Sequence, residues 1–139
     1  MNSRRRAAAL FAALLLAGGA AQAAPLPPPV RAEVDALLDR LQRSGCQFGR
    51  NGSWYEAGEA RAHLLKKLAY LEDKNLVASS EDFIERAATR SSVSGQAYLV
   101  RCGGSQAAPV ESRAWLSAEL KALRAAAAPA GPSGSSARR

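Results

Sequence analysis

The chain has two cysteines, and each lies at one end of a segment that is typical of a β-strand. In residues 46–50, larger side chains alternate with Gln47 and Gly49, and this period of two predicts a short strand. Residues 97–102 are rich in β-favouring side chains and end at the second cysteine. We therefore expect the two segments to form a small two-stranded antiparallel sheet.

The register of this sheet follows from the side chains that it would place opposite each other. If the two cysteines lie opposite each other, Phe48 opposes Val100 and Arg50 opposes Tyr98. Each pair matches in character on one face, as a half-buried sheet requires. The apolar pair would then face the helices, with Arg50 and Tyr98 at the end of the sheet farther from the cysteines.

The N-terminal segment has the three parts of a secretory signal peptide. Arg4–Arg6 supply positive charge, residues 7–17 form an apolar run too short to span a bilayer, and Ala21-Gln22-Ala23 is a small-x-small cleavage site. We expect cleavage before Ala24, which removes the signal peptide at 1–23. The mature protein is then expected to be periplasmic or secreted, with no membrane span.

In an exported chain, two cysteines are expected to form one disulfide, here Cys46–Cys102. This bond would close a loop of about 57 residues and stabilise the fold by about 4 kcal/mol in the chain-entropy model. The sequence has no Cys-x-x-Cys motif, which favours a structural disulfide over a reactive pair.

The formal net charge of +7 over 139 residues is concentrated at the two ends of the chain. Removing residues 1–23 takes away three arginines and no acidic residue, which lowers the charge to +4, and Arg138-Arg139 carry two of the remaining charges. Nucleic-acid binding needs a clustered basic face, which the sequence does not show. We therefore expect no nucleic-acid partner.

Helical periodicity organises the rest of the chain into one domain. Apolar residues recur at helical spacing in four segments, which predicts helices at 30–43, at 57–73, from a cap at Ser79 or Ser80 to about 89, and from Pro109 to about 124. Asn51-Gly52 is a turn signal, and whether residues 53–55 form a return strand or lead into the next helix stays open. The predicted organisation is a Pro-rich linker at 24–29, a single α+β domain at 30–124 and a disordered tail at 125–139.

Polar side chains gather at the end of the predicted sheet that lies away from the cysteines. His63 and Lys67 are four residues apart and share one flank of the helix at 57–73, which could face this end. An arginine, hydroxyls and turn N–H groups suit a carboxylate or another small anion. The candidate ligand-binding residues are Arg50, Asn51, Tyr55, His63, Lys67, Ser92, Ser94 and Tyr98. Alternatively, Arg50 and the serines satisfy backbone groups around two tight turns.

Other classes of site have weaker signals. A hydrolase could be drawn from Ser92 or Ser94, His63 and Glu59, but no Gly-x-Ser-x-Gly motif supports it. One histidine and no spare cysteine leave too few ligands for a metal. The sequence has no phosphate loop or dinucleotide fingerprint, so we expect no cofactor. A third interpretation is a structural partner of an envelope protein that docks through Trp54 and Tyr55.

Four short motifs follow one another in a characteristic order. They are F-x-R-N-G at 48–52, A-x-x-H-L-x-x-K at 60–67, F-I-x-x-A at 83–87 and S-G-x-x-Y-x-V at 94–100. Over about residues 31–123 the chain resembles a family of small exported proteobacterial proteins catalogued as a domain of unknown function (YfeK-like). The resemblance implies export, and it supplies no activity, cofactor or catalytic residue.

These observations lead to one expected fold and one preferred function. The fold is α+β, with about four helices packed around a small two-stranded antiparallel sheet and one disulfide. The function is that of a non-enzymatic periplasmic binding or interaction module, with a small anionic ligand or an envelope protein as its partner. A small serine/histidine hydrolase is the alternative.

Overall fold

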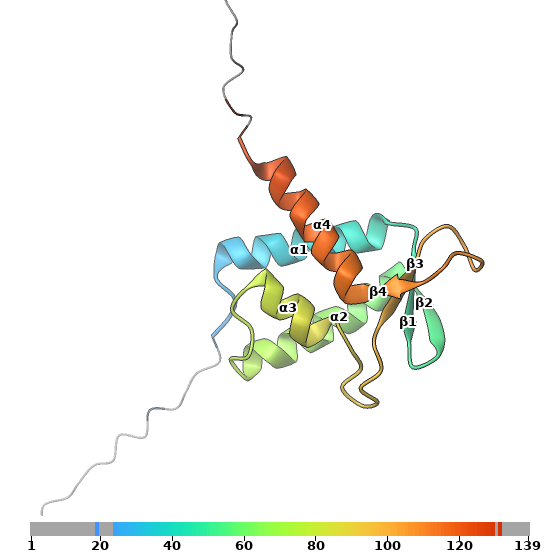
Figure 1. The fold of residues 1–139 in the computed structure, drawn as a ribbon. Helices are drawn as coiled ribbons and strands as arrows, with labels where there is room; N and C mark the ends of the chain where they lie inside the picture. Colours follow the sequence, from blue (N-terminus) through green and yellow to red (C-terminus); the bar gives the residue numbers. More distant parts are fainter. Residues whose placement is uncertain (1–18, 20–23, 130, 132–139) are drawn as a thin grey trace, which may run out of the picture.

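The computed structural model describes residues 19, 24–129 and 131, which form a helical domain with a sheet at one end (Figure 1). The predicted signal peptide lies outside these residues, apart from Gly19, as does most of the predicted tail. The elements in chain order are α1 (Pro28–Arg43), β1 (Gln47–Arg50), β2 (Ser53–Glu56), α2 (Ala57–Asp73), α3 (Ser80–Ala87), β3 (Leu99–Arg101), β4 (Val110–Glu111) and α4 (Ser112–Ala127).

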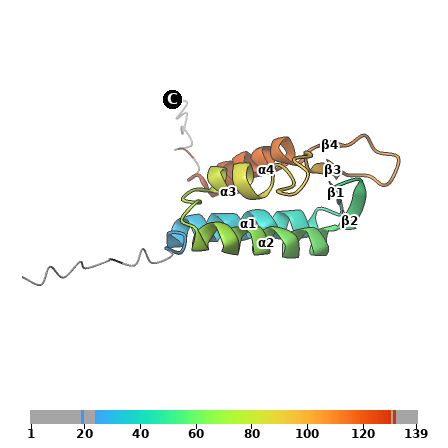
Figure 2. The same ribbon diagram turned by 90° about the horizontal axis from the view of Figure 1, so that it is seen from below.

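The helices form two layers. Figure 2 shows α1 and α2 in one layer and α3 and α4 in the other, and the sheet at one end of both. Each helix buries the apolar stripe that its periodicity predicts. The buried core residues of the four helices include Val34, Leu37, Leu38, Leu41, Leu64, Leu68, Leu71, Phe83, Ile84, Ala87, Leu116 and Leu120.

Local capping accounts for two of the helix starts. The Ser79 hydroxyl accepts a hydrogen bond from the backbone N–H of Asp82 at 3.0 Å, which identifies Ser79 as the N-cap of α3. The Asp82 carboxylate accepts from the backbone N–H of Ala78, so the reciprocal bond of a capping box is not made to the cap residue. At the start of α2, Glu59 accepts from the backbone N–H of Glu56 at 3.3 Å.

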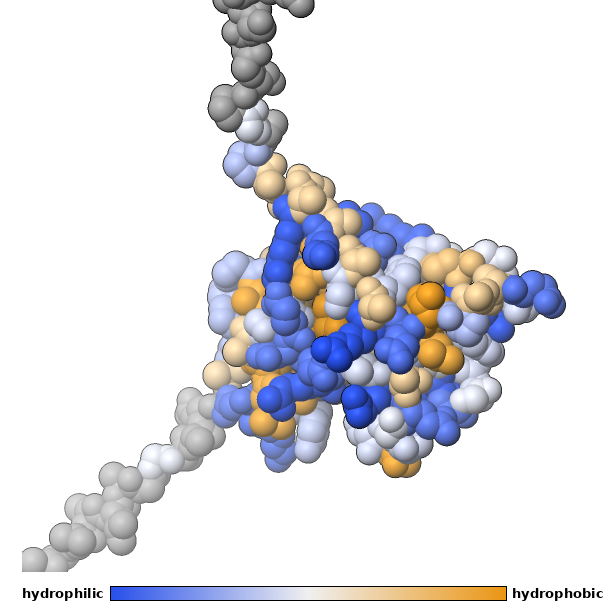
Figure 3. All heavy atoms as spheres, viewed as in Figure 1, coloured by the Kyte–Doolittle hydropathy of each residue, from blue (hydrophilic) through white to orange (hydrophobic). Residues whose placement is uncertain are grey.

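The outer face of α3 and α4 carries many charged side chains, which appear blue among tan and orange residues in Figure 3. Arg124 of α4 pairs there with Glu33 of α1 and Glu81 of α3, and these hydrogen bonds lower the pKa of both carboxyl groups. Arg124 therefore links three helices across the surface, far from the sheet.

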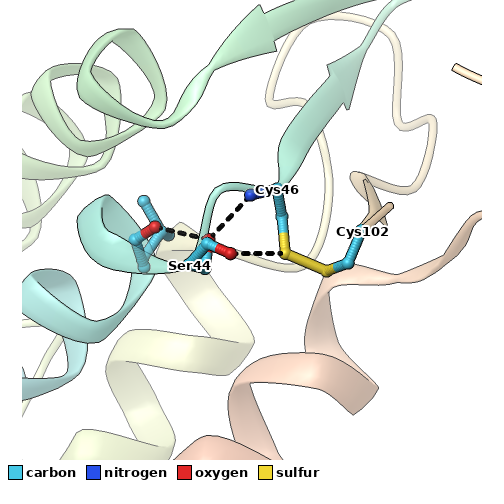
Figure 4. Close-up of a disulfide and its surroundings, with 4 residues drawn as sticks. Ser44, Cys46 and Cys102 are labelled. Atoms are coloured by element: carbon cyan, nitrogen blue, oxygen red, sulfur yellow. Dashed lines mark hydrogen bonds between the residues drawn. A yellow bond between two sulfur atoms is a disulfide. The ribbon is translucent and has the colours of Figure 1, made fainter. Parts of the chain in front are cut away.

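The sheet has four antiparallel strands in the order β2-β1-β3-β4, so the prediction of two strands is wrong. The predicted register of the central pair is confirmed, because Phe48 of β1 lies opposite Val100 of β3. The Cα atoms of Cys46 and Cys102 are 4.3 Å apart and the predicted disulfide is formed (Figure 4). The backbone N–H of Cys46 also donates to the Ser44 hydroxyl, which secures the turn that leads from α1 into β1.

The two additional strands come from local features that allow more than one conformation. Asn51 and Gly52 have φ angles of 50° and 80°, which is the geometry of a two-residue hairpin turn, and β2 follows from it. Pro109 does not open a helix. Proline is also compatible with the start of an edge strand, and here Val110 pairs with Val100 before α4 begins at Ser112.

Helix boundaries otherwise follow the expectations closely. Helix α2 occupies the predicted residues, and α1 begins two residues earlier than predicted, inside the expected Pro-rich linker. Helix α3 ends at Ala87, before the predicted end at about residue 89. Helix α4 continues to Ala127, three residues beyond the expected end of the domain.

Candidate functional site

The sheet register and the α2 flank bring four of the predicted residues into direct contact. Arg50 Nη1 lies 2.7 Å from His63 Nδ1, and His63 Nε2 lies 3.0 Å from the Tyr98 hydroxyl. Lys67 Nζ donates to the same hydroxyl at 3.2 Å and to the Arg90 carbonyl at 2.9 Å. We call Arg50, His63, Lys67 and Tyr98 the Arg50 cluster.

The order of donors in the Arg50 cluster is fixed by chemistry. A guanidinium can only donate, so His63 Nδ1 accepts from Arg50 and the ring proton of neutral His63 sits on Nε2. The Tyr98 oxygen then accepts from His63 and from Lys67, which uses both of its lone pairs. Its remaining capacity is its own proton, so the Tyr98 hydroxyl acts as a donor toward any further group.

Burial disfavours the charged forms of His63, Lys67 and Tyr98 in this cluster. The pKa of His63 is lowered, first by burial and then by the charges of Arg50, Lys67 and Lys66. Burial, and then the charge of Arg50, lowers the pKa of Lys67, while burial raises the pKa of Tyr98. His63 and Tyr98 are therefore neutral at pH 7, and the charge of the cluster is positive.

All members of the Arg50 cluster except Lys67 border a cleft of about 320 Å³ between the sheet and α2. Arg50, His63, Tyr98 and Ser112 lie along it as polar groups, and the rim carries charged residues of α2. The remaining wall is apolar and is formed mainly by Phe48, Ala60 and Leu64. A polar end and an apolar wall within one concave surface are typical of a small-molecule site.

Tyr55 belongs to the cleft through its ring. It lies opposite Phe48 in the β1–β2 pair, and this places its ring beneath Arg50, whose guanidinium carbon is 4.8 Å from the ring centroid. Such a cation–π contact holds the guanidinium in place without neutralising its charge.

The predicted turn residues do not join the cleft. The Ser94 hydroxyl donates to the Asn51 side chain at 2.5 Å, and this exposed contact joins the β1–β2 turn to the loop before β3. Ser92 is exposed and makes no side-chain hydrogen bond with any other described residue. Asn51 and Ser94 therefore fit the structural interpretation of the turns. Ser92 contacts neither the cleft nor a backbone group of the turn among the described residues. Arg50, His63 and Tyr98, by contrast, line a concave surface.

The sequence did not predict that two polar residues, Lys66 and Ser112, belong to the cleft. Lys66, rather than Lys67, lies on the rim of the cleft, while Lys67 contacts Tyr98 from the other side. Ser112 is 3% exposed and lines the cleft. Its backbone N–H donates to the Tyr98 carbonyl at 2.8 Å. No sequence signal pointed to Ser112, because its position depends on the unexpected pairing of β4 with β3.

The geometry gives no support to a serine/histidine hydrolase. Both nitrogens of His63 are engaged, one by Arg50 and one by Tyr98, rather than by a serine. Glu59 binds the backbone of Glu56 instead of His63. A nucleophile–base pair requires a serine within hydrogen-bond reach of the imidazole.

The aromatic edge of the sheet is partly occupied by the protein itself. Trp54 is half-buried, and the Arg101 guanidinium lies over it with its carbon 3.9 Å from the ring centroid. A Cβ added at Gly49 would lie only 3.1 Å from the indole, so the tryptophan packs directly on the glycine.

Within residues 19, 24–129 and 131, no three histidine, cysteine or acidic side chains come together as a potential metal site. In the same residues, no helix combines the length and the apolar character needed to cross a membrane.

Comparison with known proteins places this domain among its relatives. A stretch of 68 residues is 35% identical to the uncharacterized protein YfeK of Salmonella typhimurium, which covers 48% of this chain and 55% of that protein. The match thus spans about half the length of this curated relative. No solved structure matches the chain. Residues 28–124, which include every helix and strand up to the last turn of α4, match a family of unknown function, DUF5329. The chain therefore belongs to the DUF5329 family.

Proposed function

We propose that this protein is an exported, non-enzymatic module that binds a small anionic ligand in the cleft at Arg50. The main support is a positive charge without a carboxylate partner. Among the described residues, neither Arg50 nor Lys67 takes part in a salt bridge, whereas Arg40 pairs with Glu119 at 2.9 Å elsewhere on the surface. A partly buried guanidinium that faces a cleft is a natural contact for an anion.

The hydrogen-bond directions support the same class of ligand. Arg50 can only donate hydrogen bonds, and the remaining hydrogen-bonding capacity of Tyr98 is also that of a donor. A carboxylate or another oxyanion accepts hydrogen bonds without offering any. A ligand of this class satisfies both groups, whereas a cation would meet repulsion from the cluster.

Export is supported by the N-terminal segment and by the disulfide. Disulfides persist in oxidising compartments such as the periplasm, and Cys46 and Cys102 are bonded. Expression of the full chain in a Gram-negative host tests this part. We expect a periplasmic product whose N-terminus is Ala24 by intact mass, and a product that retains residues 1–23 in the cytoplasm would contradict it.

Ligand binding is tested by thermal shift on the exported protein with inorganic phosphate, sulfate and small carboxylates at constant ionic strength. At least one anion should raise Tm, and Arg50→Ala should abolish the rise. Loss of a charged hydrogen bond costs roughly 1.5–3 kcal/mol, which corresponds to a roughly 10- to 150-fold weaker Kd.

Arg86→Ala is the matched control for this experiment. Arg86 is exposed on α3 and does not line the cleft, so its removal changes the net charge equally. Ligand binding should survive in this variant. If Arg86→Ala weakens binding as much as Arg50→Ala does, the effect is one of overall charge and the proposed site is wrong.

A further inference from the structure

The wall of the cleft opposite its polar end is apolar and well ordered by packing. Phe48 and Leu64 are 7% and 5% exposed, and Ala60 lies beside them on α2. The Phe48 ring is held edge-on against Trp115, with the ring centroids 5.8 Å apart. An inorganic anion at Arg50 would leave this wall in contact with water.

The size of the cleft also exceeds that of an inorganic anion. Its volume of about 320 Å³ corresponds to roughly ten water molecules at ~30 Å³ each. A ligand that fills this space therefore has about ten non-hydrogen atoms, most of them beside the apolar wall.

The charge around the polar end suits a single negative charge. Arg50 is the one formally charged group of the inner cleft lining among the described residues, because Tyr98, His63 and Ser112 are neutral. Lys67 is turned toward the Arg90 carbonyl, and the rim carries both Lys66 and Glu59. A planar carboxylate matches the planar guanidinium. Because the charges of Lys66 and Glu59 on the rim offset each other, a dianion would face only one unbalanced cation in the inner cleft.

We infer that the ligand is a monocarboxylate carried on an apolar body, such as a medium-chain alkyl or an arylalkyl acid. This inference rests on the proposed function and specifies its ligand class. The carboxylate lies at Arg50 and Tyr98, with the Ser112 hydroxyl as a further polar contact. The apolar body lies along Phe48, Ala60 and Leu64.

The inference is tested by titration calorimetry of the exported protein with acetate, hexanoate, 3-phenylpropanoate, the neutral amide 3-phenylpropanamide, and inorganic phosphate. Each buried methylene strengthens binding about fourfold. Hexanoate has four methylenes more than acetate, so it should bind at least tenfold more tightly even if only half of them are buried. The amide and phosphate should each bind at least tenfold more weakly than 3-phenylpropanoate.

Two variants separate the two ends of the site. Arg50→Ala should weaken the binding of every carboxylate. Ala60→Leu fills the apolar side of the cleft, so hexanoate should no longer bind more tightly than acetate, while acetate itself should still bind. Ala118→Leu adds the same side chain at an exposed position of α4, and it should change neither the affinity for acetate nor the preference for hexanoate. Unfolding curves show that each variant is folded. The ring signals of His63, the one histidine of the chain, report occupancy at the polar end by NMR.

The possible outcomes distinguish this inference from the proposed function. If phosphate or acetate binds in an Arg50-dependent manner but hexanoate binds no more tightly than acetate, the inference on the apolar body is overturned and the proposed anion site stands. If the amide binds as tightly as the acid, or no anion binds in an Arg50-dependent manner, both are overturned. If Ala60→Leu leaves the preference for hexanoate intact, the body does not lie on this wall and the inference fails.

Discussion

Reduction of the disulfide should remove a large part of the stability of this domain. The bond joins positions 56 apart, Cys46 before β1 and Cys102 after β3. For a closed loop of about 57 residues, the chain-entropy relation gives close to 14 cal/mol/K, or about 4 kcal/mol at 25 °C. A domain of this size has a net stability of roughly 5–15 kcal/mol, so the loss is substantial while the reduced protein is still expected to fold.

Urea unfolding in the presence and absence of a phosphine reductant measures this loss directly. With an m-value of about 1.5 kcal/mol/M, the midpoint should fall by about 3 M. The double variant Cys46→Ser/Cys102→Ser should match the reduced protein and should not respond to the reductant. A loss below about 1 kcal/mol would refute the reasoning, since it would mean that the unfolded chain already keeps the two strands close together.

Further predictions concern the site, the sheet and a helix start. Because burial and the nearby charge of Arg50 lower the pKa of His63, the unfolded chain holds the imidazole proton more tightly than the native protein does. The free energy of unfolding should therefore fall as pH drops below about 6.5 toward the lowered native pKa. Urea unfolding at a series of pH values measures this dependence, and His63→Gln should remove it. An unchanged profile would show that His63 is not the group responsible. Gly49→Ala should cost about 1–3 kcal/mol by overpacking, because its Cβ would lie 3.1 Å from Trp54. A shift in tryptophan fluorescence should accompany the loss, and a variant with wild-type stability and emission would show that the indole moves freely. Ser79→Ala should cost about 1 kcal/mol by removing the N-cap of α3, and thermal unfolding with no loss would show that the cap is replaced by water.

The parts of the structure that the sequence predicts well are those that depend on short-range patterns. The stripe of apolar residues every three or four positions defines α2 from Ala57 to Asp73, because a helix buries one face whatever it packs against. The alternation around Phe48, together with the two cysteines, was enough to derive the register of the central strand pair. A one-residue shift would have turned the apolar side chains of that pair away from the core.

The candidate site was predictable to the extent that it follows from this register. Arg50 and Tyr98 lie one position beyond the last residue pair of β1 and β3. His63 bridges their side chains from one flank of α2. Asn51 and Ser94 were grouped with them because they are close in the sequence to the same end of the sheet. They point to the exposed surface instead, since a tight turn directs its side chains outward.

By itself, then, the sequence determined the helices, the disulfide and the central strand pair, because periodicity and opposing cysteines act through local geometry and one strong constraint. Only the tertiary structure decided the two outer strands, the entry of Ser112 into the cleft and the direction of every hydrogen bond in the Arg50 cluster. Val110 and Glu111 are too short a segment to predict as a strand, and they form one because β3 offers unpaired backbone groups at its edge. The donor order exists because an arginine from β1, which can only donate, meets a histidine from α2.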